Sequence, residues 1–476
     1  MPTVLEKIRV LGENGKWDVC ASTASNRSEV APNLYGTRAN GNENENNWVG
    51  STIASGVCHS YTPDGRCVSL FKVLFTNKCI YSCKYCFNNV CKQRMEFTPE
   101  EYAKVFMKLY SMNVLEGLFL SSGVCGSADE TTIKMLETVK LLRFTYGFQG
   151  YIHFKCLPGT SFYLLKEAIS LVDRISVNLE APTKEYLADI AEQKKFNKDI
   201  IQRQQWINEI RLRHNRDVMR EIKDYQEDDR IKLPQQFYDP LVNPKNMETG
   251  HNHQSYEPHH PNQPRKSSLA TGEWIDADGF ERRATGYNKI RWDGAPILNT
   301  GQTTQLVLGA GGESDWDVLK RLDWEYREIN LRRGYFSAFF PISGTPLEKL
   351  NPTPLEREHR LYQTDWLLRL YDFRIRDIKE ILTDEENLPR GDPKVHLARL
   401  YFEGNNPIDP NTASKQDLLK VPGIGIQSTR RILHLRAHQQ KITSRAQLQA
   451  IGVVLKRAEP FLKINGTSQR TISQFI

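Results

Sequence analysis

Apolar and polar positions follow two periods along this chain. Short, nearly continuous apolar stretches, typical of buried strands, recur along it. Most are followed by segments whose apolar residues return every three or four positions, as on one face of a helix. The predicted strands are 67–76, 117–123, 150–158, 173–181, 303–311 and 334–342, and the predicted helices are 98–112, 129–146, 160–172, a long polar helix beginning near Thr183, and 314–329.

This alternation predicts an α/β fold with a parallel sheet that curls into a partial barrel of six strand–helix units. Functional sites in such barrels lie at the carboxyl ends of the strands. The first predicted helix has a clear start signal, because Thr98 can cap it, Pro99 suits its first turn and Glu101 completes a capping box.

The segments outside the alternation set the expected domain limits. Residues 1–67 are expected to form an irregular N-terminal extension with an Asn- and Gly-rich loop at 37–50, and 68–345 the barrel. An insertion at about 231–300 interrupts the barrel. Its histidines at 251–264 suggest a metal tract, but the surrounding Pro, Asn and Gln favour a disordered loop. A helical linker at 346–406 and a small all-α domain at 407–476 complete the prediction.

Composition indicates how large a core the chain can build and in which compartment it is expected. With 476 residues, 39% of them hydrophobic, the chain can build a large core and a further module. It has no apolar run long enough for a membrane span and no signal-peptide pattern at its start, so we expect a cytoplasmic protein with no membrane partner. In that reducing compartment its nine cysteines favour ligands, nucleophiles or small core residues over disulfides.

Positive charge is concentrated near the end of the chain. The formal net charge is only +7, but the segment from Ile408 onward holds eleven basic residues against three acidic ones. The basic residues are Lys415, Lys420, Arg430, Arg431, Arg436, Lys441, Arg445, Lys456, Arg457, Lys463 and Arg470, and the acidic ones are Asp409, Asp417 and Glu459. Such an excess indicates a polyanion as partner.

Three cysteines follow the first predicted strand of the barrel. Cys79, Cys83 and Cys86 have the spacing C-x3-C-x2-C. A structural zinc site needs four protein ligands, which Cys91 would complete. An iron–sulfur cubane held by only three thiolates leaves one iron open to an outside ligand. The clumped spacing favours the cluster, and zinc stays open as the alternative.

With these cysteines the sequence resembles the radical SAM superfamily. The resemblance implies that Cys79, Cys83 and Cys86 bind a 4Fe-4S cluster and that S-adenosylmethionine (SAM) chelates its open iron. An external electron donor would then reduce the cluster, and SAM would be cleaved to a 5′-deoxyadenosyl radical. The remaining cysteines are expected to be small buried residues, with an auxiliary cluster that includes Cys91 as the alternative.

Softer motifs in the same region are similar to the SAM contacts of that superfamily. The resemblance implies that Tyr85, just before the last cysteine, borders the adenine. It implies that Ser121 and Ser122, at the end of the second strand, contact the methionyl group. It further implies that Asn178 and Glu180, on the fourth strand, contact the ribose or the methionyl group. A glycine motif after the fifth strand implies a further contact, with an ordinary capped turn at Ser314 or Asp315 as the alternative. The implied cofactor residues are Tyr85, Ser121, Ser122, Asn178, Glu180, Gly309, Gly311 and Glu313.

Residues 417–433 carry a second motif. Gly423 and Gly425 permit a tight turn between two helical segments, and Val421 and Ile424 would anchor it. This pattern resembles the helix-hairpin-helix motif, whose backbone amides bind a DNA phosphate without reading sequence. A degenerate second copy follows, with its hairpin at 451–453. The candidate DNA-binding residues are Val421, Gly423, Ile424, Gly425, Ser428, Arg430 and Arg431, and protein docking is the alternative role for the module.

Together, the barrel and tail resemble a radical SAM family described as DNA modification or repair proteins. The carrying segments are 64–86, 176–183, 303–315, 357–373 and the tail. The resemblance implies an enzyme that modifies or repairs a nucleotide in DNA held by the tail, with a partner of the uracil-DNA glycosylase superfamily by association. The alternatives are a radical enzyme acting on RNA or protein, and a cluster-based redox sensor that controls DNA binding.

Overall fold

The computed structural model describes residues 2–15, 56–61, 67–226, 298, 300–402 and 407–468. The loop predicted at 37–50, the histidine tract at 251–264 and nearly all of the predicted insertion lie outside these residues, as does Cys20.

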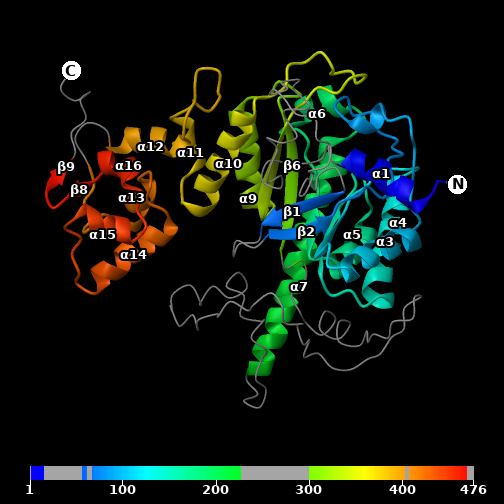
Figure 1. Ribbon diagram of the computed structural model, residues 1–476, viewed down its shortest axis with the longest axis horizontal. Coiled ribbons are helices and arrows are strands. Elements are labelled where there is room, and N and C mark those ends of the chain that lie inside the picture. Colours follow the sequence, from blue (N-terminus) through cyan, green and yellow to red (C-terminus); the bar gives the residue numbers. More distant parts are fainter. Residues whose placement is uncertain are drawn as a thin grey trace, which may run out of the picture.

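A seven-stranded sheet forms the centre of the larger part of the molecule (Figure 1). The strands are β1 Val57–Tyr61, β2 Cys67–Phe71, β3 Gly117–Leu120, β4 Tyr151–Lys155, β5 Arg174–Ser176, β6 Gln302–Leu308 and β7 Arg333–Ala338. They lie side by side in chain order, and β2 to β7 are parallel. Because β1 and β7 lie at opposite ends of this order, the curled sheet is an open, partial barrel, as the sequence pattern predicted.

Alternation along the strands separates two faces of the sheet. On β4, Ile152 and Phe154 are fully buried and belong to the large core shared with the helices. Leu118 and Leu120 do the same on β3. Since neighbouring side chains on a strand point to opposite faces, Phe119 and His153 occupy the inner face of the barrel.

The predicted helices surround the sheet. They are α3 Pro99–Ser111, α4 Ala128–Lys140 with a π-helical end at Leu141–Thr145, α5 Phe162–Leu171 and α9 Asp315–Glu328. Thr98 and Glu101 form the expected capping box of α3. The long polar helix predicted from Thr183 is instead divided into α6 Lys184–Ala191, a π-helical segment Phe196–Ile201 and α7 Gln202–Gln226.

The N-terminal extension differs from the prediction of irregular structure. Helix α1, Val4–Gly15, packs on the barrel through the fully buried Leu11, and Lys7 pairs with Glu101 of α3. Strand β1 adds to the sheet as an antiparallel edge beside β2. The sequence pattern missed both elements because each is short and is stabilised by contacts with residues far along the chain.

The helical linker predicted at 346–406 does not form one separate segment in the structure. Helix α10, Leu355–Leu370, belongs to the barrel, since the Tyr362 hydroxyl and the Glu358 carboxylate accept hydrogen bonds from the β7 amides of Phe336 and Ala338. Short helix α11, Ile375–Lys379, follows. Helix α12, Pro393–Phe402, contributes Ala398 and Phe402 to the core of the tail. The linker is therefore shared between the two cores.

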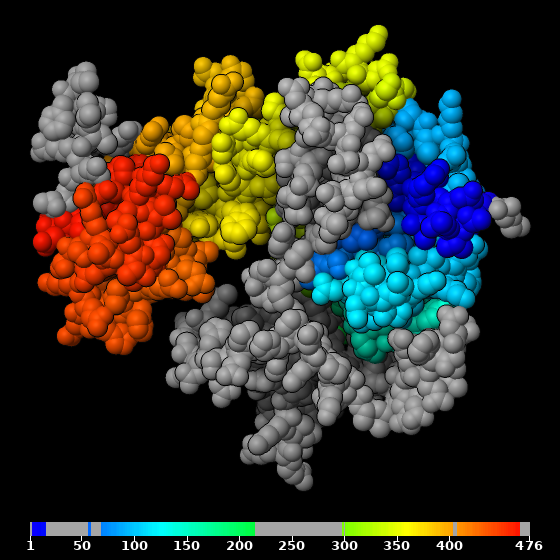
Figure 2. All heavy atoms as spheres, in the orientation of Figure 1, coloured from blue at the N-terminus to red at the C-terminus, as the bar shows by residue number. Residues whose placement is uncertain are grey.

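The tail is a small helical lobe with its own core (Figure 2). Its elements are α13 Lys415–Lys420, α14 Ile426–Ala437, α15 Arg445–Ala450, α16 Leu455–Ala458, a 3-10 turn at Glu459–Phe461, and the short β8 Lys463–Ile464 and β9 Thr467–Ser468. The pairs α13–α14 and α15–α16 each flank a hairpin, as the two sequence copies predicted. In the described part of the chain, every helix is too short or too polar to cross a bilayer.

Candidate metal centre and nucleic-acid interface

The three-cysteine loop begins where β2 leaves the sheet. Leu74 still bridges Ser121 beyond β3, and Thr76 bridges Glu96. The loop is then fixed from two sides, because the Ile80 amide donates to the Val124 carbonyl (2.8 Å) and the Lys84 amide donates to the Ile190 carbonyl (2.8 Å). These contacts place the cysteines at the carboxyl edge of the parallel strands, where the sequence predicted a site.

The three thiols share one partly water-excluded environment. Cys83 is buried, and Cys79 and Cys86 are partly buried. Burial, followed by the neighbouring Cys83, raises the pKa of Cys86 to about 12, and burial also raises the pKa of Cys83. The Val124 amide donates a hydrogen bond to Cys79 Sγ (3.4 Å), the kind of contact that tunes a thiolate bound to iron.

The surroundings of Cys91 bear on the choice between zinc and a cluster. Among the described residues, no three Cys, His, Asp or Glu side chains are close enough together to hold a single metal ion. Cys91, the fourth ligand of the zinc alternative, contacts the side-chain amides of Asn77 (3.5 Å) and Asn14 (3.6 Å) instead. With these contacts, Cys91 is not placed as a fourth ligand beside the three cysteines, as the zinc alternative requires.

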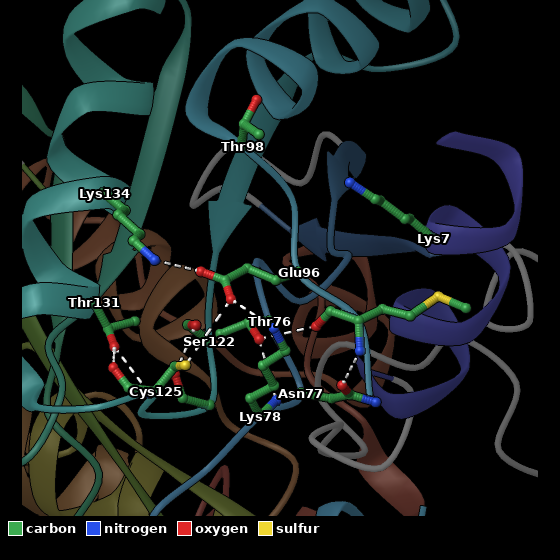
Figure 3. Close-up of polar contacts among 12 residues, drawn as sticks. Lys7, Thr76, Asn77, Lys78, Glu96, Thr98, Ser122, Cys125, Thr131 and Lys134 are labelled. Carbon is green, nitrogen blue, oxygen red and sulfur yellow. Dashed lines mark hydrogen bonds and ion pairs between the residues drawn. The ribbon is translucent and has the colours of Figure 1, made fainter. Parts of the chain in front are cut away.

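Polar contacts stabilise the base of the cysteine loop (Figure 3). The Glu96 carboxylate pairs with Lys134 (2.6 Å) and Lys78 (3.2 Å). Although burial opposes it, these two lysines hold the pKa of Glu96 below its ordinary value. Cys125 lies beside the same carboxylate (3.9 Å), and its amide donates to the Thr131 hydroxyl (2.9 Å). The network joins the cysteine loop to α4.

The predicted serines lie next to this loop. The Ser121 carbonyl accepts from the Phe75 amide (2.8 Å), and the Gly123 amide donates to the Thr76 carbonyl (2.7 Å). A side chain at Gly123 would stand 2.6 Å from the Lys78 carbonyl, so only glycine permits this approach. The turn after β3, which holds Ser121 and Ser122, and the cysteine loop are therefore in direct backbone contact.

Glu180 has an unexpected partner in Lys194. The two side chains are buried and pair at 3.0 Å. Glu180 also adopts the left-handed region with φ of 65°, while bridging Leu306 of β6. Although burial opposes it, Cys83 and Glu180 hold the pKa of Lys194 above its ordinary value, so Lys194 stays protonated beside the thiols. Sequence reasoning missed Lys194, which lies in a polar stretch without a motif.

Tyr85 and Asn178 complete the group of predicted residues at this edge. Burial and then Glu180 raise the pKa of Tyr85 well above its ordinary value, which places its phenol near the carboxylate. Asn178 is 8% exposed and lies two residues before Glu180. The structure thus brings Tyr85, Glu180 and the three cysteines together.

The glycine motif after β6 is a closed turn. The buried Glu313 carboxylate accepts hydrogen bonds from the amides of Gly309 and Gly311 (3.3 Å for the second). Ser314 then caps α9 and forms a capping box with Asp317. The same bonds occupy the Glu313 carboxylate and the two glycine amides, so any contact of this turn with a cofactor is left to the carbonyl groups of the glycine backbone. The local geometry is therefore that of an ordinary strand-to-helix turn capped by Ser314, which the sequence left open as the alternative.

The two hairpins of the tail interlock. The Val454 amide donates to the Gly423 carbonyl (2.9 Å), and the Ser428 hydroxyl donates to the Gly452 carbonyl (2.9 Å). Val421 and Ile424 are buried, so they shape the hairpin and offer no side chain to a ligand. Gly425 is the N-cap residue of α14, and no side chain caps this end of the helix.

The two candidate arginines differ in their surroundings. Both are exposed, but Arg431 Nη1 donates to the Ile451 carbonyl of the second hairpin (3.2 Å). Arg430 lies at the surface of α14. Arg430 is therefore the better candidate for a purely electrostatic contact with phosphate.

The first hairpin also contacts the linker. Lys394 Nζ of α12 donates to the Ile424 carbonyl (2.8 Å) and lies 4.4 Å from the centre of the Tyr371 ring. Burial lowers the pKa of Lys394 to about 7. The motif alone did not predict this contact, which ties the tail to the end of the barrel domain.

The comparisons with known proteins agree with the two motifs. Residues 73–213 match the family model of the radical SAM superfamily, and residues 403–458 match that of the helix-hairpin-helix motif. The chain therefore contains a radical SAM domain and a helix-hairpin-helix motif. Members of that superfamily are enzymes that use a 4Fe-4S cluster and SAM.

Solved structures offer distant likenesses. The [FeFe]-hydrogenase maturase HydG from Carboxydothermus hydrogenoformans has 11% identity and a TM-score of 0.37 over 62% of this chain and 49% of its own. The match thus spans about half of that protein. Methylornithine synthase (PylB) has 12% identity and a TM-score of 0.35 over 79% of this chain and 84% of its own. No curated protein matches the sequence.

Proposed function

We propose that Cys79, Cys83 and Cys86 hold a 4Fe-4S cluster at the carboxyl edge of the barrel, and that SAM binds beside it. The observation that carries this proposal is one loop with three neighbouring thiols, fixed on both sides at that edge. When bound and reduced by an external electron donor, the cluster and SAM would supply the 5′-deoxyadenosyl radical typical of the superfamily.

The surrounding side chains would bind and orient these groups. The Lys194 ammonium near Cys83 offsets negative charge on the thiolates, and the Val124 amide donates to Cys79 Sγ. Ser121, Ser122, Asn178 and the backbone carbonyl groups of Gly309 and Gly311 are the proposed contacts for SAM. Tyr85 would border the adenine.

The test of the cluster is a comparison of single cysteine variants. Cys79→Ser, Cys83→Ser and Cys86→Ser should each lose most bound iron after anaerobic reconstitution and reduce 5′-deoxyadenosine release to background. Cys91→Ser is the matched control, because Cys91 contacts two asparagine amides outside the proposed ligand set. Equal loss of iron in the control would replace the three-ligand proposal with a four-ligand site.

We propose DNA as the substrate that the tail delivers. Two interlocked hairpins, the uncapped start of α14 and the exposed Arg430 support a contact with phosphates that depends on shape and charge. A base inside a duplex cannot reach the mouth of a barrel, so a flipped nucleotide or a single strand would be the reacting form. The proposal places the enzyme in the cytoplasm, where thiols stay reduced.

The substrate is tested by adding candidate partners to the reconstituted enzyme. Release of 5′-deoxyadenosine should rise with single-stranded DNA and stay near the uncoupled rate with tRNA or no addition. Stimulation by tRNA alone would assign the enzyme to RNA. Deuterated DNA should transfer label into 5′-deoxyadenosine, which would identify the strand as the hydrogen donor.

A further inference from the structure

Lys394 approaches the first hairpin of the tail from outside the motif. It is the second residue of α12, the helix that lies between α10 and the tail (Figure 1). Its Nζ donates to the Ile424 carbonyl (2.8 Å), and the residue is only 8% exposed. The Tyr371 ring, at the end of α10, lies 4.4 Å from the ammonium. A lysine of the linker is thus buried against the turn that carries the proposed DNA contact.

The bond to Ile424 acts on the peptide group that precedes α14. The Ile424 carbonyl and the Gly425 N–H belong to this one peptide group, which is planar and trans, so they point in opposite directions. Because Lys394 binds the carbonyl on one side, the Gly425 N–H points to the other. Gly425 is the N-cap residue of α14, and its N–H has no acceptor among the described residues. Lys394 therefore acts on the direction of a free donor at the start of the helix.

The turn by itself restrains this peptide group weakly. Glycine at position 425 lets the preceding peptide rotate more easily than another residue would. No side chain caps α14, so the helix does not hold the Gly425 N–H from within. The Ile424 amide donates to the Val421 carbonyl (3.2 Å), but that amide belongs to the preceding peptide group. Within the described part of the chain, Lys394 is the hydrogen-bond partner of the peptide between Ile424 and Gly425.

The surroundings of Lys394 make its charge sensitive to what the hairpin binds. Burial, opposed by Asp392 and reinforced by Arg457, lowers the pKa of Lys394 to about 7. Asp392 is itself paired with Arg457 and also accepts from the Lys394 backbone amide. The Tyr371 phenol stays neutral near pH 7, because burial raises its pKa. An anion at the start of α14 would favour the charged lysine and raise its pKa.

We propose that Lys394 is a positioning residue of the DNA contact, which directs the Gly425 N–H toward a DNA phosphate through its bond to the Ile424 carbonyl. A hydrogen bond to the carbonyl also polarises the peptide, which makes its N–H a stronger donor. The effect weakens when Lys394 loses its proton, so the hairpin should bind phosphate more tightly at neutral than at alkaline pH. This assignment rests on the proposed function, because it takes DNA as the ligand of the tail.

The first test follows the Gly425 N–H in the full-length protein without DNA. Nuclear magnetic resonance with isotope-labelled glycine should show the Gly425 signal moving between about pH 6 and about pH 8, as Lys394 loses its proton. In Lys394→Arg and Lys394→Met the signal should stay nearly constant, because neither side chain titrates there. A signal that stays constant in the natural protein, or that moves equally in Lys394→Arg, would overturn the proposal.

The Gly425 signal is identified by its loss in Gly425→Ala. This variant should fold, because Gly425 has φ of −101°, which any residue can adopt. The added Cβ would meet only the Tyr371 hydroxyl, at an ordinary contact distance of 3.6 Å. The Gly466 signal serves as an internal reference, since Gly466 lies beyond both hairpins and a Cβ there would meet nothing within 4 Å.

The second test measures affinity for single-stranded DNA by fluorescence anisotropy. The affinity of the natural protein should fall severalfold from about pH 7 to about pH 9, because binding in that range takes up a proton on Lys394. Lys394→Arg keeps its charge, so its affinity should be nearly the same at both values. Lys394→Met should bind about fivefold to tenfold more weakly than the natural protein at pH 7 and approach it at pH 9.

A control separates this role from general charge and from folding. Lys463→Met removes an exposed lysine of β8, outside both hairpins, and should keep the pH profile of the natural protein. Thermal unfolding checks the fold of each variant, and Lys394→Arg keeps the test decisive if Lys394→Met does not fold. The tail's histidines are shared by all variants, so they cannot cause a difference between them. The same pH profile in the natural protein and in Lys394→Arg would contradict the assignment.

The two tests distinguish this inference from the proposed function. If DNA binds but its pH profile is unaffected by Lys394→Arg, only this inference fails. If the Gly425 signal follows Lys394 but the protein binds no DNA, the proposed role of the tail in holding DNA fails instead.

Discussion

The mouth of the barrel, which is the carboxyl edge of its strands with the cysteine loop at 76–91, and the tail at 407–468 are stabilised in different ways. At the mouth, the buried Lys194–Glu180 pair and the partly exposed Lys134–Glu96 pair fix the loop that carries the cysteines. In the tail, the two hairpins contact each other through hydrogen bonds to backbone carbonyls over an apolar core. The cysteine loop is thus stabilised by residues far along the chain. Most of the contacts that stabilise the tail are made between residues of the tail itself.

This difference explains why the two sites respond to different changes. A buried charge without its partner is costly, so the mouth should be sensitive to the loss of a single ion-pair member. Interlocked turns leave no room for side chains, so the tail should be sensitive to added volume at its glycines.

Lys194→Met should destabilise the barrel by about 3 to 5 kcal/mol, because it leaves Glu180 buried without its partner. Urea unfolding followed by circular dichroism measures the change. Lys195→Met is the matched control, since Lys195 is exposed one residue away. If both variants changed the free energy of unfolding equally, the Lys194–Glu180 ion pair would not be the source of stability here.

Gly423→Ala should destabilise the tail by about 1 to 3 kcal/mol or more. Gly423 has φ of 84°, and an added Cβ would lie within 2.4 Å of the Val454 carbonyl oxygen. Gly466→Ala has a similar φ of 80° but meets nothing within 4 Å, so it reports the backbone strain alone. Hydrogen exchange of the tail measures both. Equal effects would show that the interlocking of the hairpins adds nothing.

Glu325→Gln tests a buried acid that neither motif contains. Burial raises the pKa of Glu325 to about 8, with Arg321 opposing. The unfolded chain releases this proton at lower pH than the folded chain does, so stability should fall as pH rises from about 5 to about 8. The variant should melt at a higher temperature than the natural protein at pH 8 and show less difference at pH 5. Glu328→Gln, exposed on the same helix, should behave like the natural protein at both values.

Arg430→Gln should produce the smallest change, a severalfold loss of DNA affinity. The slope of log affinity against log salt should become shallower by about one. Fluorescence anisotropy at several salt concentrations measures this slope. Lys441→Gln removes the same charge from an exposed position beyond α14. A similar effect of both variants would mean that general charge, and not the hairpin, governs binding.

The sequence pattern predicted the order of strands and helices well, because each parallel strand is a strongly apolar segment followed by an amphipathic helix. It missed α1 and β1, whose stability comes from distant contacts such as Lys7 with Glu101. It also placed α10 in the linker, since nothing local reveals that Tyr362 packs on β7.

Those parts of the candidate site could be predicted whose chemistry requires certain residues at a fixed spacing along the sequence. Three cysteines within eight residues and the turn around Gly423 carry their own signal. Lys194 and Lys394 could not be predicted in this way, because their partners Glu180 and Ile424 lie in other segments and only folding brings them together.

The central claim is that the three thiols hold an iron–sulfur cluster with one iron open to SAM. The most direct test is electron paramagnetic resonance of the full-length protein, reconstituted and reduced without air, before and after SAM is added. We expect protein-bound iron and a cluster spectrum that changes when SAM binds. Zinc in place of iron, or a spectrum that is the same with and without SAM, would contradict the account.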